Sequence, residues 1–253
     1  MQSGQLAIGT FVGLADPQIV EIIGLAGFDA AFIDMEHTAF DLATVQQMII
    51  AAELVGITPM VRVSDSDPGF ILRLLDMGAQ GIVIPHVDGI EGAKKAVDAV
   101  RYAPIGTRGG APGSRAAKFG SVSWSEHVRT SNEEIILSVM TEDAKAIEQV
   151  PEIAALPGVD LISLGPTDLS LTLGVTGPTD PRLRAEVERI AREVKHVGNA
   201  RLQLPIDHPA FPLNPQELID LGVGYSHAFP APPQILMREM KNSVRQIHQT
   251  VGR

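Results

Sequence analysis

The sequence predicts an α/β protein of the (β/α)8 TIM-barrel class, and two observations carry that prediction. Short apolar runs rich in β-branched residues alternate with amphipathic stretches along the 253 residues, which is typical of repeated βα units. Eight such pairs can be counted, and the first strand continues into Gly13-Leu14-Ala15-Asp16 without the GxGxxG loop of a dinucleotide-binding open sheet. A closed parallel barrel fits better, and we expect one domain over residues 1–253.

Each predicted strand is followed, in most cases directly, by a helical pattern. The expected strands are Leu6–Val12, Asp29–Ile33, Thr58–Val63, Gly81–Ile84, Ile135–Met140, Leu161–Ser163, Leu202–Ile206 and Tyr225–Ala228. The expected helices are Pro17–Ala26, Leu42–Val55, Pro68–Met77, Ile90–Arg101, Asp143–Ala155, Pro181–Val197, Pro215–Leu221 and Pro233–Thr250. Several have Pro near the first turn and Gly just past the end, which is the usual asymmetry of helix termini.

One stretch, Tyr102–Glu134, fits neither pattern. It is much longer than an ordinary connection between a strand and a helix, so we expect an irregular loop with a functional or inter-subunit role.

Composition excludes several classes of function. The formal charge of −10 and the scattered basic residues argue against a nucleic-acid partner, whose phosphates need a basic face. The absence of cysteine restricts any metal site to oxygen and nitrogen ligands. We see no signal peptide in the N-terminal segment and no apolar run of membrane-spanning length, so we expect no membrane partner and a cytoplasmic location.

Polar residues gather where the predicted strands end. In a barrel of this class the carboxyl ends of the strands build the active site, so strand placement produces a set of candidates. They are Asp34, Glu36 and His37 after the second strand, Arg62 in the third, His86 after the fourth, Glu142 after the fifth, Asp168 after the sixth, Asp207 and His208 after the seventh, and His227 in the eighth.

Glu142 and Asp168 are carboxylates that follow adjacent strands. Two carboxylates, with water and substrate oxygens, suit Mg²⁺ or Mn²⁺, which prefer oxygen ligands and keep open positions. The alternative is structural: Asp168 could cap the helix that it begins, and Glu142 could favour the positive end of its own helix. Spacing alone leaves both interpretations open.

The remaining candidates also have two interpretations. His37, three residues after Asp34, could be an acid/base oriented by that carboxylate, or a rim histidine bonded to a loop. Arg62 must have a partner at the end of its apolar strand, either a structural carboxylate such as Asp76 or a substrate oxyanion. His86, His208 and His227 are weaker rim candidates. We expect the other histidines, His127, His196 and His248, to be solvated.

Lysine placement excludes one mechanism. All six lysines fall in predicted helices or in the long loop, namely Lys94, Lys95, Lys118, Lys145, Lys195 and Lys241. A Schiff-base lyase on a barrel needs a desolvated lysine that points inward from a strand. If the chain handles a 2-oxo acid, we expect it to stabilise the enolate by another route, and a metal is the obvious one.

Several motifs, in one order from about Gly9 to Leu173, resemble the HpcH/HpaI family. The motifs are GFDAAFIDMEH, PMVRV, LLDMGAQGIVIP, RYAPIGTRGG and LPGVDLISLGPTDLSLTLG, together with the strand that precedes Glu142. The family contains class II pyruvate-dependent aldolases, such as 4-hydroxy-2-oxo-heptanedioate and 2-keto-3-deoxy-sugar-acid aldolases, on barrels of the phosphoenolpyruvate/pyruvate-binding type. GPTDLS together with DMEH is quite specific to this group.

The resemblance implies a role for each matching residue. Glu142 and Asp168 would bind a divalent metal, Mg²⁺ or Mn²⁺, with Co²⁺ as an alternative. Arg62 would contact the 2-oxo oxygen and steady the enolate, and His37 paired with Asp34 would be the acid/base, acting through a metal-bound water.

The substrate carboxylate would lie against the backbone of Gly165, Pro166 and Thr167, where a helix begins. Asp76 resembles a residue that reaches a neighbouring subunit's site. Family members are typically trimer-based hexamers with an exchanged C-terminal helix, and residues 233–250 would be that helix here. The chain departs from the family at Met140, where Gln is usual, and in the segments around His208 and His227. We therefore expect an altered affinity or donor preference at Met140. The resemblance leaves the aldehyde partner open, and His208 or His227 would contact it.

The expected activity is class II aldehyde-lyase chemistry: reversible cleavage of a 4-hydroxy-2-oxo acid into an aldehyde and pyruvate, or an analogue such as hydroxypyruvate. The alternatives on the same scaffold are oxaloacetate decarboxylation and acyl-CoA lyase activity of the malyl or citramalyl type. Coenzyme A would need a basic groove, which only the loop with Arg101, Arg108, Arg115 and Lys118 could supply. The remote alternative is a non-catalytic barrel that binds a 2-oxo acid.

Overall fold

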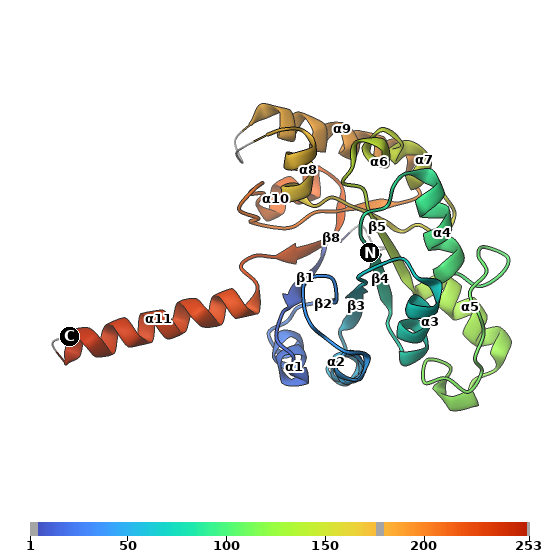
Figure 1. Cartoon of the computed structure of the whole chain (residues 1–253), viewed down its shortest axis with the longest axis horizontal. Coiled ribbons are helices and arrows are strands. Elements are labelled where there is room, and N and C mark those ends of the chain that lie inside the picture. Colours follow the sequence, from blue (N-terminus) through green and yellow to red (C-terminus); the bar gives the residue numbers. More distant parts are fainter. Residues whose placement is uncertain (1–4, 176–179, 252–253) are drawn as a thin grey trace.

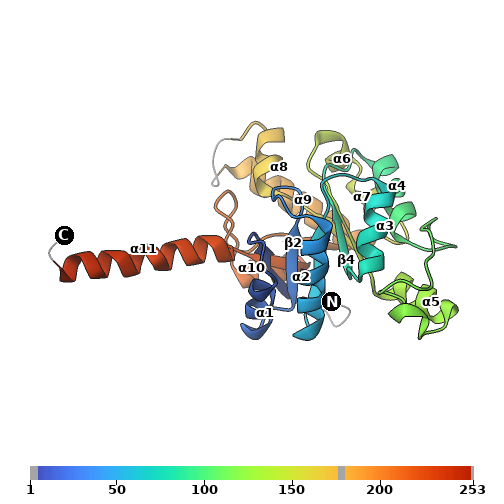
Figure 2. The same cartoon turned by 60° about the horizontal axis from the view of Figure 1, so that its bottom comes forward.

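The computed structural model describes residues 5–175 and 180–251. Residues 1–4 lie outside this range. They begin the N-terminal segment in which no signal peptide was expected. Eight parallel strands close into a barrel in sequence order, with β1 paired to both β2 and β8 (Figures 1 and 2). The predicted (β/α)8 fold is confirmed.

The strands are β1 (Ala7–Val12), β2 (Ala30–Asp34), β3 (Thr58–Arg62), β4 (Gly81–Ile84), β5 (Ile136–Met140), β6 (Leu161–Ser163), β7 (Arg201–Gln203) and β8 (Val223–Ala228). The helices are α1 (Pro17–Leu25), α2 (Leu42–Leu54), α3 (Pro68–Met77), α4 (Ile90–Val100), α5 (Trp124–Glu134), α6 (Ala144–Glu148), α7 (Val150–Ala154), α8 (Pro166–Thr172), α9 (Pro181–Val197), α10 (Pro215–Asp220) and α11 (Pro232–Thr250), with a 3₁₀ turn at Lys118–Gly120.

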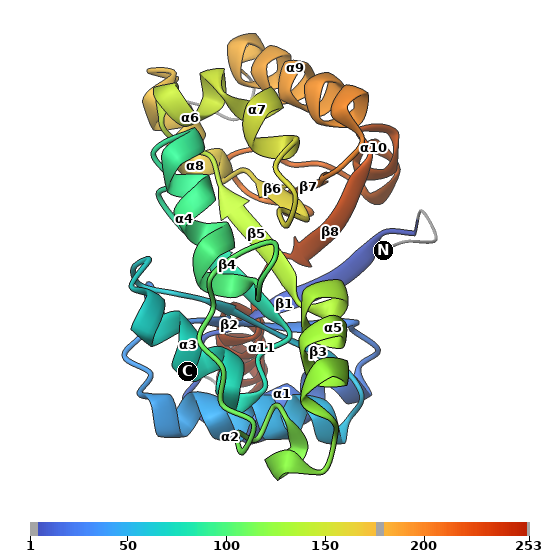
Figure 3. The same cartoon turned by 90° about the vertical axis from the view of Figure 1, so that its right-hand side faces the viewer.

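The main apolar core lies between the outer face of the strands and the surrounding helices. Figure 3 shows α2, α3, α4, α7 and α9 arranged around the strands. Helix starts are set by side-chain caps: Asp41, Asp67 and Asp180 each accept a hydrogen bond from a backbone N–H of the following turn. Such caps satisfy amide groups that have no partner inside the helix.

The barrel interior is a separate, smaller core. Its buried apolar side chains are Ala30, Phe32, Met60, Val83, Met140, Leu161 and Tyr225. Successive side chains of a strand alternate between its two faces, so the residue two positions further along faces the interior again, one layer higher. In β2, β3, β6 and β8 that next residue is polar: Asp34, Arg62, Ser163 and His227. The alternation of side chains therefore places these polar groups inside the barrel, at the carboxyl ends of the strands.

Three predictions about the elements were wrong. The stretch Tyr102–Glu134 is not wholly irregular, because Ser123 caps α5 by accepting from the Glu126 N–H. The single helix expected at Asp143–Ala155 is two short helices, because the pattern breaks at Gln149, before Pro151. The seventh strand ends at Gln203, two residues before Pro205, which has no N–H for the sheet.

Helix α11 projects away from the barrel (Figures 1 and 2), and none of its residues is buried. It nevertheless carries large apolar side chains, all exposed: Ile235, Leu236, Met237, Met240, Val244 and Ile247. Several of these are spaced by three or four residues, which places them along one side of the helix. Among the described residues, no helix is long and apolar enough to cross a membrane.

Candidate active site

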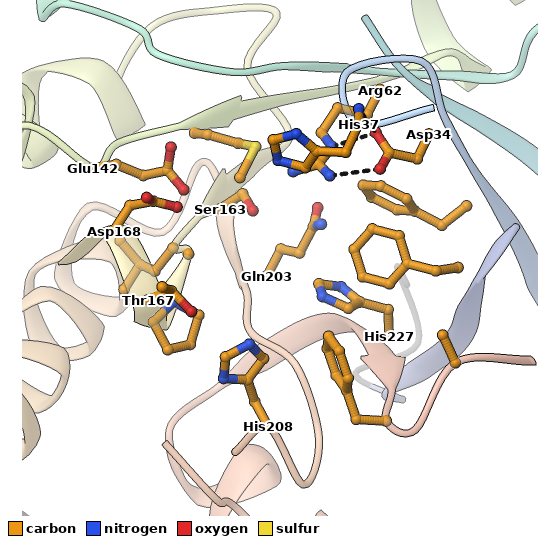
Figure 4. Close-up of a pocket in the computed structure, with 18 of the residues that line it drawn as sticks. Asp34, His37, Arg62, Glu142, Ser163, Thr167, Asp168, Gln203, His208 and His227 are labelled. Carbon is orange, nitrogen blue, oxygen red and sulfur yellow. Dashed lines mark hydrogen bonds and ion pairs between the residues drawn. The ribbon is translucent and has the colours of Figure 1, made fainter. Parts of the chain in front are cut away.

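A cavity of about 470 Å³ opens at the carboxyl ends of the strands. Eleven of the predicted site residues line it (Figure 4): Asp34, His37, Arg62, Met140, Glu142, Gly165, Pro166, Thr167, Asp168, His208 and His227. Sequence reasoning therefore found most of the residues that the fold brings together here. The carboxylates of Glu142 and Asp168 lie on one side, and Arg62 with Asp34 lies on another.

Arg62 is held by two carboxylates. Its Nε and Nη2 donate to the two oxygens of Asp34 at 2.9 and 2.8 Å, and its Nη1 lies 2.9 Å from Glu36 Oε2. The guanidinium also lies 5.5 Å from the ring centre of Phe11. Of the two interpretations of Arg62, the structural ion pair is observed, with Asp34 and Glu36 as partners and not Asp76. Each terminal nitrogen keeps a second N–H for a ligand.

Glu36 is a residue to which sequence reasoning assigned no role. It stands inside the DMEH motif, in the turn after β2, where its N–H donates to Oδ1 of Asp34 at 3.0 Å. Its Oε1 lies 2.9 Å from His86 Nε2, and its Oε2 lies 3.7 Å from His37 Nε2. Glu36 therefore links both rim histidines to Arg62.

The expected pairing of the His37 ring with Asp34 is wrong in this structure. Both carboxylate oxygens of Asp34 are bound to Arg62, and His37 contacts Asp34 only through its backbone N–H, at 3.4 Å. The side chain of His37 is 68% exposed, so the ring is free to meet a ligand at the mouth of the cavity. His86 does not line the cavity, but its Nδ1 lies 3.8 Å from Glu142.

Glu142 and Asp168 form the opposite side of the cavity, and here a counter-charge is missing. Glu142 is buried, and its Oε1 has no hydrogen-bond partner. Burial, followed by the charge of Asp168, raises the pKa of the Glu142 carboxyl to about 7.

Gly165 passes between the two carboxylates. A Cβ at this position would meet Glu142 Oε1 at 2.0 Å and Asp168 Oδ2 at 3.4 Å. Any other residue would displace the carboxylate of Glu142, so a glycine is required for the pair to come together.

A divalent cation fits this pair. Two carboxylates meet there, one buried oxygen is unpartnered, and hard cations prefer oxygen ligands. Within residues 5–175 and 180–251, no group of three or more His, Cys, Asp or Glu side chains is arranged to hold a metal. A cation bound by Glu142 and Asp168 would therefore take its remaining ligands from substrate and water.

The floor of the cavity contains polar groups that sequence reasoning missed. Ser163 and Gln203 line it beside Met140, and Gln203 is almost completely buried. The Oε1 of Gln203 accepts a hydrogen bond of 2.8 Å from the hydroxyl of Ser138, across the barrel interior. Both residues lie in predicted strands, and the two-residue period would have placed them inward had it been applied to polar positions.

The remaining side of the cavity is aromatic. His227 packs edge-on against Phe11, with ring centres 4.5 Å apart, and His208 packs edge-on against Phe229 at 4.7 Å. Burial, followed by the charges of Arg62 and His208, lowers the pKa of His227 to about 3. His227 is therefore neutral at physiological pH.

Asp76 and the long loop lie apart from this cavity. Asp76 pairs with Arg108 at 3.2 Å, and Arg108 stacks over the ring of Tyr102. Arg101 is buried against Asp160, and Arg115 pairs with Glu53. These arginines do not form the basic groove that coenzyme A would need. His127, which was expected to be solvated, is buried in this region because Tyr102 and Trp124 pack against its ring.

Comparisons with known proteins assign the chain to a family. The family model for HpcH/HpaI aldolase/citrate lyase matches residues 7–204. A hydroxypyruvate/pyruvate aldolase from Pseudomonas aeruginosa is 33% identical over 243 residues, which are 95% of this chain and 88% of that protein. A 2-dehydro-3,6-dideoxy-6-sulfogluconate aldolase from Pseudomonas putida is 36% identical over 192 residues, 76% of this chain and 74% of that protein.

A solved structure is also similar over nearly its whole length. The HpcH/HpaI aldolase from Desulfitobacterium hafniense DCB-2 superposes with a TM-score of 0.87 at 28% identity, covering 98% of this chain and 94% of that one. Because the family model spans most of the chain and the relatives are matched over most of their length, the chain belongs to the HpcH/HpaI aldolase/citrate lyase family and is an enzyme of the aldolase/lyase type.

Proposed function

We propose that this enzyme is a divalent-metal-dependent aldolase that cleaves a 4-hydroxy-2-oxo acid into an aldehyde and pyruvate, or an analogue such as hydroxypyruvate. One observation carries the proposal: a carboxylate pair, the buried Glu142 and the more exposed Asp168, shares a cavity with Arg62, and Oε1 of Glu142 has no hydrogen-bond partner. Cleavage of the C3–C4 bond leaves negative charge on C3 and the 2-oxo oxygen, and preorganised positive charge lowers the barrier to that step.

Glu142 and Asp168 would hold the cation, with Mg²⁺ or Mn²⁺ the best match to their oxygen donors and Co²⁺ a possible substitute. When bound, the cation supplies Lewis-acid charge beside the 2-oxo acid. The pair of carboxylates balances that charge, and Gly165 leaves the space in which they converge.

Arg62 acts on the other side of the substrate. Asp34 and Glu36 fix the plane of its guanidinium through three nitrogens, so its position does not need to reorganise during the reaction. A remaining N–H of Arg62 donates to the 2-oxo oxygen as that oxygen becomes enolate-like. The substrate carboxylate lies against the backbone of Gly165–Thr167, where α8 begins.

His37 moves the proton. Its Nε2 takes up the proton of the 4-hydroxyl group, through a water molecule, while the C3–C4 electron pair passes to the enolate and the aldehyde carbonyl forms. The same proton then returns to C3 and completes pyruvate. Oε2 of Glu36 lies 3.7 Å from that nitrogen, close enough to form an ion pair with the ring while it carries the proton.

The test is pyruvate release from a panel of 4-hydroxy-2-oxo acids and from oxaloacetate, first with EDTA and then with added Mg²⁺, Mn²⁺ or Co²⁺. We expect activity to vanish with the chelator and to return with metal, with hydroxy acids cleaved better than oxaloacetate is decarboxylated. Activity that is indifferent to EDTA overturns the metal site. A dominant oxaloacetate decarboxylase, or cleavage of acyl-CoA thioesters alone, overturns the aldolase assignment. Binding of 2-oxo acids without turnover overturns catalysis altogether.

We also propose that the enzyme assembles as a homo-oligomer, a trimer or hexamer, through α11. The helix exposes an apolar row on a segment that the barrel does not cover, and exposed apolar patches of this kind mark contact surfaces. Asp76, which lies outside the cavity of its own chain, would then reach a neighbouring site. Sedimentation of a chain that ends at Ala231 checks this: we expect a smaller species, and an unchanged mass contradicts the proposal.

A further inference from the structure

The loop after β7 presents His208 at the edge of the cavity in an unusually constrained way. Asp207 has a φ of 54°, in the left-handed region that non-glycine residues rarely adopt. Its N–H donates to the Leu213 carbonyl at 3.0 Å, and the Phe211 N–H donates to the His208 carbonyl at 3.0 Å. Backbone strain that the surrounding contacts maintain is typical of functional positions. In Figure 4 the ring of His208 points from the lower edge into the cavity, and it packs edge-on against Phe229 on the aromatic side.

The backbone sets the protonation of this ring. The Ala210 N–H donates to Nδ1 of His208 at 3.1 Å, so Nδ1 must be the unprotonated nitrogen. The single proton of the neutral ring is then on Nε2. Burial lowers the pKa of His208, in agreement with a neutral ring. No hydrogen bond or ion pair to Nε2 is found among the described residues, so His208 offers one N–H donor to whatever enters this end of the cavity.

The same end of the cavity has no positive charge to offer. Among the described residues that line the cavity, Arg62 is the one Lys or Arg side chain, and Asp34 and Glu36 already bind it. The walls around His208 are the neutral rings of His227 and Phe229. A second carboxylate on the substrate would be desolvated here without a counter-ion, which is costly.

We propose that the aldehyde fragment bound at this end is uncharged and carries an oxygen that accepts a hydrogen bond from Nε2 of His208. This inference rests on the proposed aldolase function and names its substrate class: 4-hydroxy-2-oxo acids with a further hydroxyl or carbonyl oxygen and no second carboxylate. A purely apolar fragment fits the aromatic walls but leaves the N–H of His208 without an acceptor, and sites built around such a donor discriminate against analogues that lack the oxygen.

The test measures the reverse reaction, condensation of aldehydes with pyruvate in the presence of the activating metal. Glycolaldehyde and propanal differ by one hydroxyl in place of a methyl group, and succinic semialdehyde adds a carboxylate. For the unmodified enzyme we expect kcat/KM for glycolaldehyde to exceed both others by about tenfold or more. Equal rates with glycolaldehyde and propanal, or a preference for succinic semialdehyde, overturn the inference.

Two replacements separate the donor from the loop. In His208→Asn, the side-chain oxygen can still accept from the Ala210 N–H, but no donor remains at the Nε2 position. In His208→Gln, the amide nitrogen lies near the Nε2 position, and the bond to Ala210 is lost. We expect the preference for glycolaldehyde over propanal to disappear in the Asn variant and to persist, in part, in the Gln variant. The reverse result would assign His208 to holding the loop and overturn its role as a donor. His196→Asn, on the exposed surface of α9, is the matched control and should keep the preference.

Enolate formation can be followed without any aldehyde, by exchange of the pyruvate methyl protons into D₂O. If the unmodified enzyme with added metal does not exchange them, the proposed aldolase function fails. If exchange proceeds but the enzyme prefers the charged aldehyde, the aldolase function stands and the substrate class proposed here is wrong.

Discussion

Two carboxylate pairs lie at the carboxyl end of the barrel, and they differ in how their charge is balanced. Asp34 and Glu36 are bound by three nitrogens of Arg62 at 2.8–2.9 Å. Glu142 and Asp168 have no guanidinium or ammonium partner among the described residues, and one buried oxygen of Glu142 has no partner at all. The negative charge of the first pair is balanced by a side chain of the same protein, whereas that of the second pair is not.

This difference separates a supporting role from a binding role. A carboxylate that already has its partner positions that partner, so Asp34 and Glu36 act through Arg62. A buried carboxylate without a partner is destabilising unless a cation or a proton arrives. Burial, followed by the charge of Asp168, raises the pKa of Glu142 to about 7, so this carboxyl is costly to ionise without a neighbouring positive charge.

Removing one carboxylate of the second pair should have the largest effect. In Glu142→Ala or Asp168→Ala we expect metal-dependent pyruvate release to fall by roughly a thousandfold or more, because the Lewis acid loses a ligand. The fold should remain, since the one ion-pair contact of these side chains, between Glu142 and the exposed ring of His86, is long at 3.8 Å. Steady-state assays with added Mn²⁺ measure the loss, and Glu133→Gln, on the exposed face of α5, is the control. Full activity in either variant would remove the metal site from the cavity.

Removing Arg62, the partner of Asp34 and Glu36, should lower both the activity and the stability of the enzyme. In Arg62→Ala we expect aldol cleavage and oxaloacetate decarboxylation to fall alike, by about 10²–10³-fold, because both pass through the same enolate. Asp34 and Glu36 would also lose their counter-charge, at a cost of about 3–5 kcal/mol in the free energy of unfolding. Paired assays and urea unfolding measure the two effects.

Two further variants control for charge and for ion-pair loss in general. Arg62→Lys should be intermediate, because it keeps the charge but not the forked geometry. Arg129→Ala breaks an exposed pair with Glu133 and should change little. If Arg62→Ala impaired only one of the two reactions, Arg62 would select a substrate and not stabilise the enolate.

The smallest effect should be a gain in stability. The pKa of Glu142 rises from 4.5 to about 7 on folding, so the folded chain resists its ionisation. Below pH 4.5 the carboxyl is protonated in both states and costs nothing. The cost grows as the pH rises toward 7 and is then constant, at up to about 3 kcal/mol. Glu142→Gln should therefore stabilise the metal-free enzyme at pH 8.

Urea unfolding in EDTA at pH 8 and pH 4.5 measures this gain, which should disappear at the lower pH. An equal gain at both values would mean better packing and not relief of charge. Added Mn²⁺ should stabilise the unmodified enzyme more than the Gln variant, because only the former keeps both carboxylates.

The candidate site could be predicted in part because a closed barrel orders its strand ends. Counting strands was enough to bring Arg62, Glu142 and Asp168 to one rim, although they lie up to 106 positions apart in the chain. The two-residue period of a strand could also have identified Ser163 and Gln203. Candidates chosen mainly from residues that follow the predicted strands do not include these two residues, because both lie within the strands.

The sequence could not predict which side chain binds the carboxylate of Asp34. Asp34 lies three residues before His37, and that short spacing suggested a pair. In the folded chain Asp34 is the last residue of β2, and Arg62, its partner in the register of the neighbouring strand β3, takes both of its oxygens. Hydrogen bonds follow distance in space, and the distance between neighbouring strands is not encoded in local spacing.

The sequence by itself determined the barrel, its strand order and the carboxylates at its rim, because alternating patterns and strand ends are local properties of the chain. Tertiary structure alone decided which carboxylates are balanced, that Gly165 leaves room for Glu142 beside Asp168, and which nitrogen of His208 carries the proton. Those properties depend on the burial of charges and on contacts between distant segments, and both exist only once the barrel has closed.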